Sequence, residues 1–345
     1  MNAAPQPPHG RTLALVMLTL VCVFWGSTFP LMKDSYALIG EHAGEKGRDI
    51  APMAFLALRF VLATLLMPLA FLPLLLRGKA KPSDQSAPHV GHQAPRKSRR
   101  GLYKLSLALG VLFTGAFYLQ VYGLRDTTPA ISAFLTSLYV IFTPAIVLSL
   151  GRQLPGWRVM ISTLIALTGV AFIAYEPDIS FQSLIGDWGV MLSLACAVGF
   201  AGHIVLTDYA TKREDPALLS LLMMVVASVI GIAVLGVAVG PTEMLRLCWA
   251  MLGDWGVMWR MLIMVVFATT FAVYAWNRWQ KDLGPTRASV LYTLEPVFAT
   301  IFSVMIALDH LRWQLFVGGG MIIAANLLCE LAAALKKKKP QVANA

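Results

Sequence analysis

Long stretches without a charged residue are the feature that most limits what this chain can fold into. Three of them, Thr12–Met32, Thr127–Gly151 and Pro216–Thr242, are each longer than the roughly 20 apolar residues that a helix needs to cross the hydrocarbon core of a bilayer. Only 13% of the 345 residues are charged and 57% are hydrophobic, which is far from the composition of soluble domains. The chain is therefore predicted to be an integral membrane protein and not a water-soluble enzyme.

Ten apolar segments of this kind can be traced along the chain. They are twice as long as the strands of a membrane barrel and do not alternate polar with apolar residues, so we expect an all-α polytopic membrane protein. Pro144 and Pro296 predict kinks in the fourth and ninth segments. The expected spans are 12–32, 52–76, 102–123, 129–150, 157–175, 187–207, 217–239, 257–277, 286–307 and 313–335.

The 28 Lys and Arg residues are distributed unevenly between these segments. If the N-terminus is inside, 20 of them fall in inner segments and seven in outer ones, which by the positive-inside rule predicts both termini in the cytoplasm. We expect a cytoplasmic tail over 1–11, a disordered basic loop over 77–101 and a basic tail over 336–345. This placement beside acidic lipid accounts for the net charge of +10, so no nucleic-acid partner is expected.

The sequence contains an internal repeat. "VMLTLVC" at 16–22 returns as "VMLSLAC" at 190–196. Each copy contains five crossings, and because five is odd, the two copies enter the membrane from opposite sides. The chain is therefore predicted to form two inverted five-helix repeats over 12–175 and 187–335, with a site near the membrane midplane between them. Further matches recur at an offset of 156 positions: Thr114, Ala116, Tyr118, Asp126 and Pro129 return as Thr270, Ala272, Tyr274, Asp282 and Pro285.

Four strings in this frame resemble elements of a known family. They are "FWGSTFP" at 24–30, "AFLALRF" at 54–60, "DWGVMLSLACAVGFAGHIV" at 187–205 and "YTLEPVFATIFSV" at 292–304. Together, over about 12–335, the chain resembles the EamA-type drug/metabolite transporter superfamily. The resemblance implies a ten-helix inner-membrane carrier, commonly an exporter of amino acids or other small metabolites, with alternating access between inverted halves. Family members often carry Gly-Glu after the fourth and ninth helices, where this chain has Gly151-Arg152 and Leu308-Asp309, so no narrower subfamily is assigned.

Two charged side chains fall inside predicted spans. Glu295 is the only carboxylate near the middle of a span, and Arg59 lies in the second span. Their expected depths differ by about 5 Å, which allows a salt bridge if the helices touch. We hypothesise that one or both bind a charged substrate group or a coupling proton. The alternatives are a buried ion pair or, for Glu295, a Glu-Pro bend bonded to backbone.

Polar aromatic stripes mark the third and eighth spans. The spacing of Thr114, Tyr118 and Tyr122, and of Thr270, Tyr274 and Asn277, places each set on one helix face. Such faces favour a cavity for amphipathic or aromatic solutes, although Tyr122 also suits the interfacial belt and His203 also suits a packing role. The predicted substrate pathway comprises Trp25, Arg59, Thr114, Tyr118, Tyr122, Tyr139, His203, Thr270, Tyr274, Asn277, Tyr292 and Glu295.

These patterns favour a secondary transporter of a small organic solute, an amino acid or related metabolite, that works by alternating access, with export as the expected direction. We expect no catalytic residue, no cofactor and no metal, because the sequence carries no phosphate-binding loop, zinc-ligand spacing or nucleophile elbow. The expected partners are the solute, the lipid bilayer and a coupling proton. An integral-membrane enzyme acting on lipid would need carboxylate, His or Cys groups clustered at one membrane boundary. A receptor or scaffold would show no solute flux.

Overall fold

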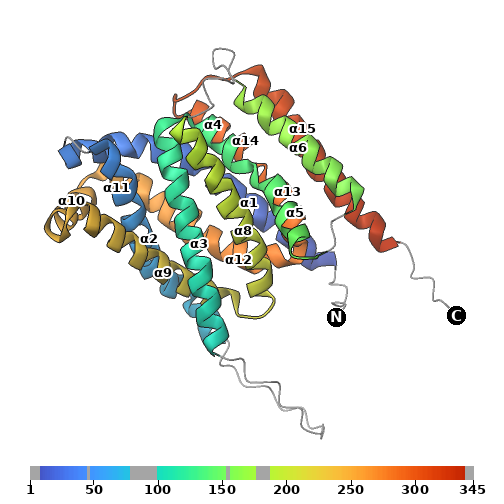
Figure 1. Ribbon diagram of the computed structural model, residues 1–345, viewed down its shortest axis with the longest axis horizontal. Coiled ribbons are helices and arrows are strands. Elements are labelled where there is room, and N and C mark those ends of the chain that lie inside the picture. The colour runs from blue at the N-terminus through green and yellow to red at the C-terminus, as the bar shows by residue number, and fades with distance from the viewer. Residues whose placement is uncertain (1–7, 45–46, 78–98, 153–155, 176–186, 339–345) are drawn as a thin grey trace, which may run out of the picture.

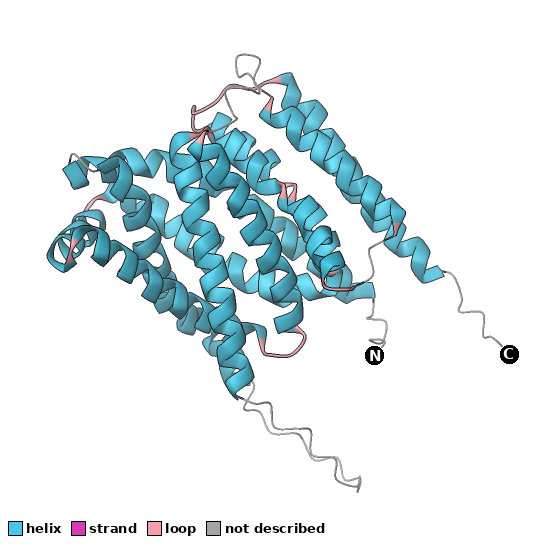
Figure 2. Ribbon diagram, in the orientation of Figure 1, coloured by secondary structure: helices cyan, strands magenta, loops and turns pink. Residues whose placement is uncertain are grey.

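The computed structural model describes residues 8–44, 47–77, 99–152, 156–175 and 187–338. Most of the predicted loop over 77–101 lies outside these residues, as do parts of the two predicted tails. The regular structure of the described residues is helical, without a strand (Figure 2). Within the same residues, ten helical segments are long and apolar enough to cross a membrane. The all-α fold with ten spans is therefore confirmed.

The helices of the two halves follow the same order. A short helix, α10 (Pro241–Gly253), joins the second and third spans of the second half. The first half consists of α1 (Pro8–Ala43), α2 (Gly47–Arg77), α3 (Arg99–Asp126), α4 (Pro129–Ser137), α5 (Tyr139–Ser149) and α6 (Trp157–Ala174). The second half consists of α8 (Trp188–Thr211), α9 (Pro216–Val239), α11 (Trp255–Ile263), the π-helix η2 (Met264–Phe271), α12 (Ala272–Leu283), α13 (Pro285–Tyr292), α14 (Glu295–Met305) and α15 (Trp313–Lys338).

The first helix is longer than the charge-free stretch predicts. The sequence places its end at 32, whereas α1 continues to Ala43, because the charged residues that follow are paired. The Lys33 ammonium donates to the carbonyls of Leu124 at 2.9 Å and Arg125 at 2.8 Å, which the end of α3 leaves unbonded. Asp34 forms an ion pair with Arg260 of α11. Paired charges thus allow the helix to run on past the apolar segment.

The two halves have opposite orientations in the bundle. We call the end at which α1 begins and α15 finishes the terminal end (Figure 1). Gly189, at the start of α8, lies against Thr127, next to the last turn of α3 and to Lys33 of α1. The first helix of the second half therefore begins at the end opposite to the start of α1.

The packing of the helices follows a two-fold pattern. α1 packs against α12 and α14 of the second half, as α8 packs against α3 and α5 of the first. α2 packs against α9, its own counterpart, and α6 packs against its counterpart α15 at one edge of the bundle (Figure 1). The core of the protein is thus the interface between two inverted five-helix repeats.

The fourth and ninth spans are each interrupted near the middle. α4 gives way to α5 at Leu138, and α13 gives way to α14 at Thr293 and Leu294. A hydroxyl beside each break bonds to backbone: Ser137 Oγ donates to a carbonyl at 2.8 Å and Thr293 Oγ1 at 2.6 Å. Such bonds compete with the helical ladder and bend helices. The break before Pro296 agrees with the predicted kink.

Pro144 is placed differently from that prediction. The break in the fourth span is at Leu138. Pro144 lies six positions later, inside α5. Its ring removes one donor of the ladder, but the interruption falls at the hydroxyl-bearing turn. The two breaks are therefore related by the repeat, since positions 138 and 294 are separated by the same 156 residues as the matching sequence elements.

Glycine allows α6 and α15 to touch through their backbones. A Cβ atom at Gly169 would lie 2.6 Å from the carbonyl oxygen of Gly318, and one at Gly318 would meet the carbonyl of Gly169. Without a hydrophobic force between helices in lipid, such close packing is a main source of association. Gly320, on the same helix, has nothing within 4 Å of its Cβ position.

Gly318→Ala should therefore destabilise the protein, because the added methyl group forces two backbones apart. We expect a loss of about 1–3 kcal/mol, measured as a lower midpoint of thermal unfolding in detergent. Gly320→Ala is the matched control and should be neutral or slightly stabilising, because alanine favours helix over glycine. Equal midpoints for the two variants would contradict the proposed backbone contact.

Candidate functional site

A cavity lies where the two interrupted helices meet the first and third helices of each half. It contains about 410 Å³ of space between atoms, and its centre is wide enough for little more than a water molecule. Glu295 is the one charged side chain among its lining residues. These are Trp25, Thr28, Phe117, Gln120, Thr136, Tyr139, Phe200, Ile204, Trp276, Tyr292 and Glu295.

The lining residues are related by the internal repeat. Three pairs of them are 156 positions apart and so occupy equivalent places in the two halves. α1 and α8, which are also equivalent, contribute the remaining residues apart from Phe117 of α3. The cavity therefore lies on the axis that relates the two halves. The equivalent pairs are Gln120 with Trp276, Thr136 with Tyr292, and Tyr139 with Glu295.

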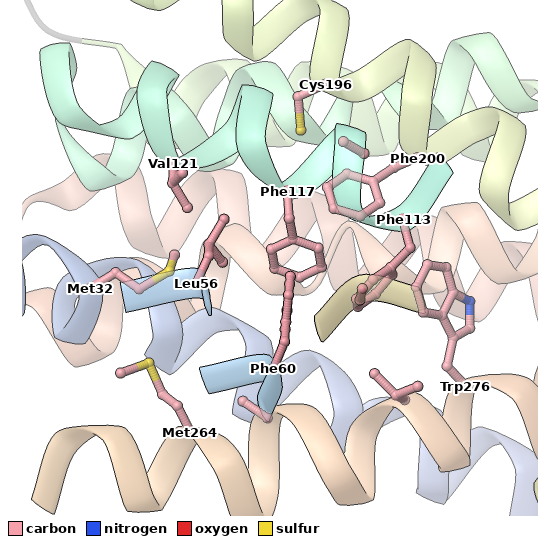
Figure 3. Packing of buried hydrophobic residues seen from close by; sticks show 14 of the residues in the cluster. Met32, Leu56, Phe60, Phe113, Phe117, Val121, Cys196, Phe200, Met264 and Trp276 are labelled. Atoms are coloured by element: carbon pink, nitrogen blue, oxygen red, sulfur yellow. The ribbon is translucent and has the colours of Figure 1, made fainter. Parts of the chain in front are cut away.

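Aromatic rings form most of the cavity wall. The Trp25 and Trp276 rings meet edge to face with centroids 4.7 Å apart, and Tyr292 lies 6.0 and 6.1 Å from them. Figure 3 shows Trp276 beside Phe113, with Phe117 and Phe200 on the adjoining wall. These edge-to-face contacts are the arrangement that aromatic quadrupoles favour. The wall thus offers apolar area with few polar groups.

The π-helix η2 supplies two hydrogen-bond acceptors beside this wall, one backbone carbonyl and one side-chain hydroxyl. Its wider turns leave carbonyls without the usual ladder partner, and the Trp25 indole donates to the Ala268 carbonyl at 3.0 Å. Thr269, the next residue, accepts a bond from Arg59 at 2.7 Å. The irregular turn therefore holds two predicted site residues, one from α1 and one from α2.

Gln280 fixes two of the aromatic residues. Its side-chain oxygen accepts hydrogen bonds from the Trp276 indole and from the Tyr292 hydroxyl, the latter at 3.2 Å. Its amide donates to the Ile204 carbonyl at 2.7 Å. Gln280 is fully buried and sits one turn beyond Trp276, so it positions the wall without lining the cavity. The sequence analysis did not identify it.

Glu295 is the first residue of α14, directly after the helix break. It is 6% exposed, and one carboxylate oxygen accepts a bond from the Tyr139 hydroxyl at 3.5 Å. No cation pairs with it in the part of the chain that the structure describes. A buried carboxylate with one long hydrogen bond is incompletely satisfied. It is therefore available to a proton or to a cationic group of a solute.

Arg59 is fully buried behind the cavity wall. Its guanidinium donates to Thr269, contacts the Met32 sulfur at 3.7 Å and lies 5.6 Å from the centroid of the Phe117 ring. Among the described residues no carboxylate pairs with it, so the salt bridge to Glu295 that the expected depths allow is not formed. Phe117 lines the cavity and separates Arg59 from it.

Four of the predicted pathway residues line the cavity, namely Trp25, Tyr139, Tyr292 and Glu295. The others lie outside it in this conformation. Thr114 donates to its own helix at the Gly110 carbonyl, and Tyr122 reaches the Asp49 carbonyl at 3.0 Å. The remaining residues are Arg59, Tyr118, His203, Thr270, Tyr274 and Asn277.

His203 and Asn277 stand directly behind this wall. The His203 ring stacks obliquely on Trp276 at 4.4 Å and contacts Thr207 and Met223. Asn277 donates to Ser220 of α9 at 2.9 Å. Both residues pack and orient the second half.

The predicted stripe on the third span is displaced from the face that lines the cavity. Phe117 and Gln120 line it, whereas Tyr118 is turned by about 100°, the rotation of one helical residue. The repeat contained part of the missing signal, because Thr136 occupies the position equivalent to Tyr292, a predicted site residue. Gln120 and Trp276 are equivalent only to each other, so the repeat does not indicate them.

Polar side-chain contacts join the two halves at both ends of the bundle. At the terminal end, Arg152 after α5 lies 3.5 Å from Asp208 of α8. At the opposite end, the His42 ring bonds the Asp254 carboxylate at 2.8 Å, and this bond lowers the pKa of Asp254 below its ordinary value. This bond therefore stabilises the fold at pH values above the ordinary pKa of aspartate. The stabilisation is lost as the pH falls through the lowered pKa of Asp254.

Comparison with known proteins agrees with this architecture. The sequence pattern of the EamA-like transporter family matches residues 12–175 and again 187–329. A protein of Archaeoglobus fulgidus named "Uncharacterized transporter" is 26% identical over 321 residues, which cover 93% of this chain and 87% of the relative.

One solved crystal structure, described only as that of a protein, covers 95% of this chain and is itself covered completely. Its TM-score is 0.65 at 14% sequence identity, so the likeness shows the fold alone. The family match, which spans both repeats, confirms the resemblance found in the sequence. The chain belongs to the EamA-like transporter family and is a membrane transporter.

Proposed function

We propose that the protein is a secondary transporter that carries a small organic solute by exposing the central cavity alternately to the two sides of the membrane. The observation that carries the proposal is that equivalent residues of the two inverted halves line one cavity on the axis between them. Ion pairs hold the two halves together at each end of the bundle, Arg152 with Asp208 at the terminal end and Asp34 with Arg260 at the opposite end. The site agrees with the midplane sites of other inverted-repeat carriers.

The chemistry of the cavity supports an amphipathic solute with an amine, such as an amino acid or a related metabolite. Aromatic faces accept an apolar or aromatic body, and they also attract an ammonium group. Glu295 supplies the one negative charge. Because the cavity in this conformation admits little more than water, the halves rock apart to admit the solute.

Glu295 also serves as the site of a coupling proton in this proposal. A carboxylate that binds either a proton or the ammonium of a solute couples the two flows, because the two occupants compete for the same oxygens. The positive-inside distribution of Lys and Arg supports an inner-membrane location with both termini in the cytoplasm. The family resemblance supports export as the physiological direction. No step of this process requires a catalytic group or a cofactor.

Arg59 completes the proposed site when Phe117 turns away. A guanidinium without a carboxylate partner is costly inside a membrane and marks a functional position. In this conformation the Arg59 guanidinium contacts Thr269, Met32 and the Phe117 ring. Rotation of Phe117 as the halves move opens Arg59 to the carboxylate of the solute, while Glu295 holds the amine.

Glu295→Gln should separate transport from proton coupling. In proteoliposomes with an amino-acid panel, we expect accumulation driven by a proton gradient to fall about tenfold or more, because a charged hydrogen-bonding group is lost. Counterflow of labelled against unlabelled solute should persist but require a higher solute concentration, because Glu295 also binds the solute amine. Glu41→Gln, at an exposed position near the end of α1, is the matched control. Undiminished accumulation by Glu295→Gln would overturn the coupling role, and absence of flux in the unaltered protein would favour a receptor or scaffold.

Arg59→Met should lose transport without losing stability. Replacing a buried charge that lacks a partner by an apolar side chain of similar length is often neutral or stabilising, so the thermal midpoint in detergent should stay equal or rise. Flux of a carboxylate-bearing solute should fall about tenfold or more. A variant that unfolds earlier but transports normally would show that Arg59 is a structural residue.

A further inference from the structure

A second hollow lies at the terminal end of the bundle, between the beginning of α1, α13 and the last turns of α15. It contains about 640 Å³ of space between atoms and shares no lining residue with the central cavity. Leu15, Leu291 and Leu327 form part of an apolar floor, and Arg287 and Glu330 lie at its charged side. The central transport mechanism makes no use of this groove.

Among the side chains that the structure describes, the charged side of the groove has one more cation than it has anions. Glu330 accepts bonds from two guanidinium groups, that of Arg11 at 2.6 Å and that of Arg287 at 3.2 Å. The Nε atoms of both arginines are buried and have no hydrogen-bond partner within the described residues. Buried donors left without partners are unfavourable. The site therefore has excess positive charge and donors that an additional acceptor would satisfy.

The groove is open toward the surrounding lipid along α15. Ile323 and Leu327, both of which line it, are 52% and 61% exposed. In a membrane-spanning helix such exposed apolar side chains face acyl chains. The groove thus joins a cationic site near the end of the helices to an apolar surface that extends over about two turns of α15.

We propose that this groove binds one molecule of an anionic phospholipid. The phosphate lies at Arg11 and Arg287, and an acyl chain follows the apolar floor past Leu15, Leu291 and Leu327. The excess positive charge selects an anionic over a zwitterionic headgroup. The apolar floor selects a lipid over a free anion, because a soluble phosphate would leave that surface uncovered.

Lipid binding to the purified full chain tests this assignment. Phosphatidylglycerol, phosphatidylcholine with the same acyl chains and glycerol 3-phosphate are compared in detergent by native mass spectrometry and by thermal unfolding. We expect phosphatidylglycerol to bind about fivefold or more tightly than phosphatidylcholine and to raise the unfolding midpoint. Glycerol 3-phosphate should have no effect. Equal binding of the two lipids, or an equal effect of glycerol 3-phosphate, would overturn the proposal.

Two variants distinguish a lipid site from an ion-pair cluster that only stabilises the fold. Arg287→Gln should weaken the binding of phosphatidylglycerol about fivefold or more. Glu330→Gln breaks both ion pairs but increases the positive charge, so it should keep or strengthen that binding. If both variants lose binding equally, or neither changes it, the proposal fails. Arg11→Gln provides the same measurement as Arg287→Gln should the latter not fold.

Discussion

The structure depends on one constraint, which is that hydrocarbon supplies no hydrogen bonds to a polypeptide. An interruption in a membrane-spanning helix is therefore stable only where protein or a water-filled cavity surrounds it. Here the breaks at Leu138 and at Thr293–Leu294 come together in the centre of the bundle. Placing irregular backbone inside the protein accounts for the central cavity and for the hydroxyl bonds beside each break. It also accounts for the position of Glu295 at the start of a helix.

The halves share a backbone plan but differ in chemistry at equivalent positions. Tyr139 of the first half corresponds to Glu295 of the second, and these two residues bond to one another across the axis. Gln120 corresponds to Trp276 in the same way. A symmetric frame therefore holds an asymmetric site with one carboxylate. In the proposed mechanism, symmetry permits the two-sided movement, and the single carboxylate is the group that binds the solute amine or the proton.

Much of this fold follows from hydropathy and repetition in the sequence. Spans without charge predict the number of crossings because lipid penalises charge strongly, and an odd number of helices in each repeat predicts inversion. Side-chain direction is harder to predict. Thr114 belongs to a predicted polar stripe, yet its hydroxyl donates to the Gly110 carbonyl of its own helix, so a polar residue in a span need not face a cavity. Gln280 likewise acts through Trp276 and Tyr292, a relation that only the three-dimensional packing reveals.

The account requires that the central cavity be reached from either side of the membrane, and thiol labelling measures this most directly. The four native cysteines are replaced, and Thr136→Cys or Tyr292→Cys is reconstituted and treated with an impermeant thiol reagent on one face at a time. Both positions should react from each face, with the preference changing when transported solute is supplied on one side, whereas Val229→Cys on the exposed face of α9 should stay unreactive. Labelling of both cavity positions from a single face under all conditions would contradict alternating access.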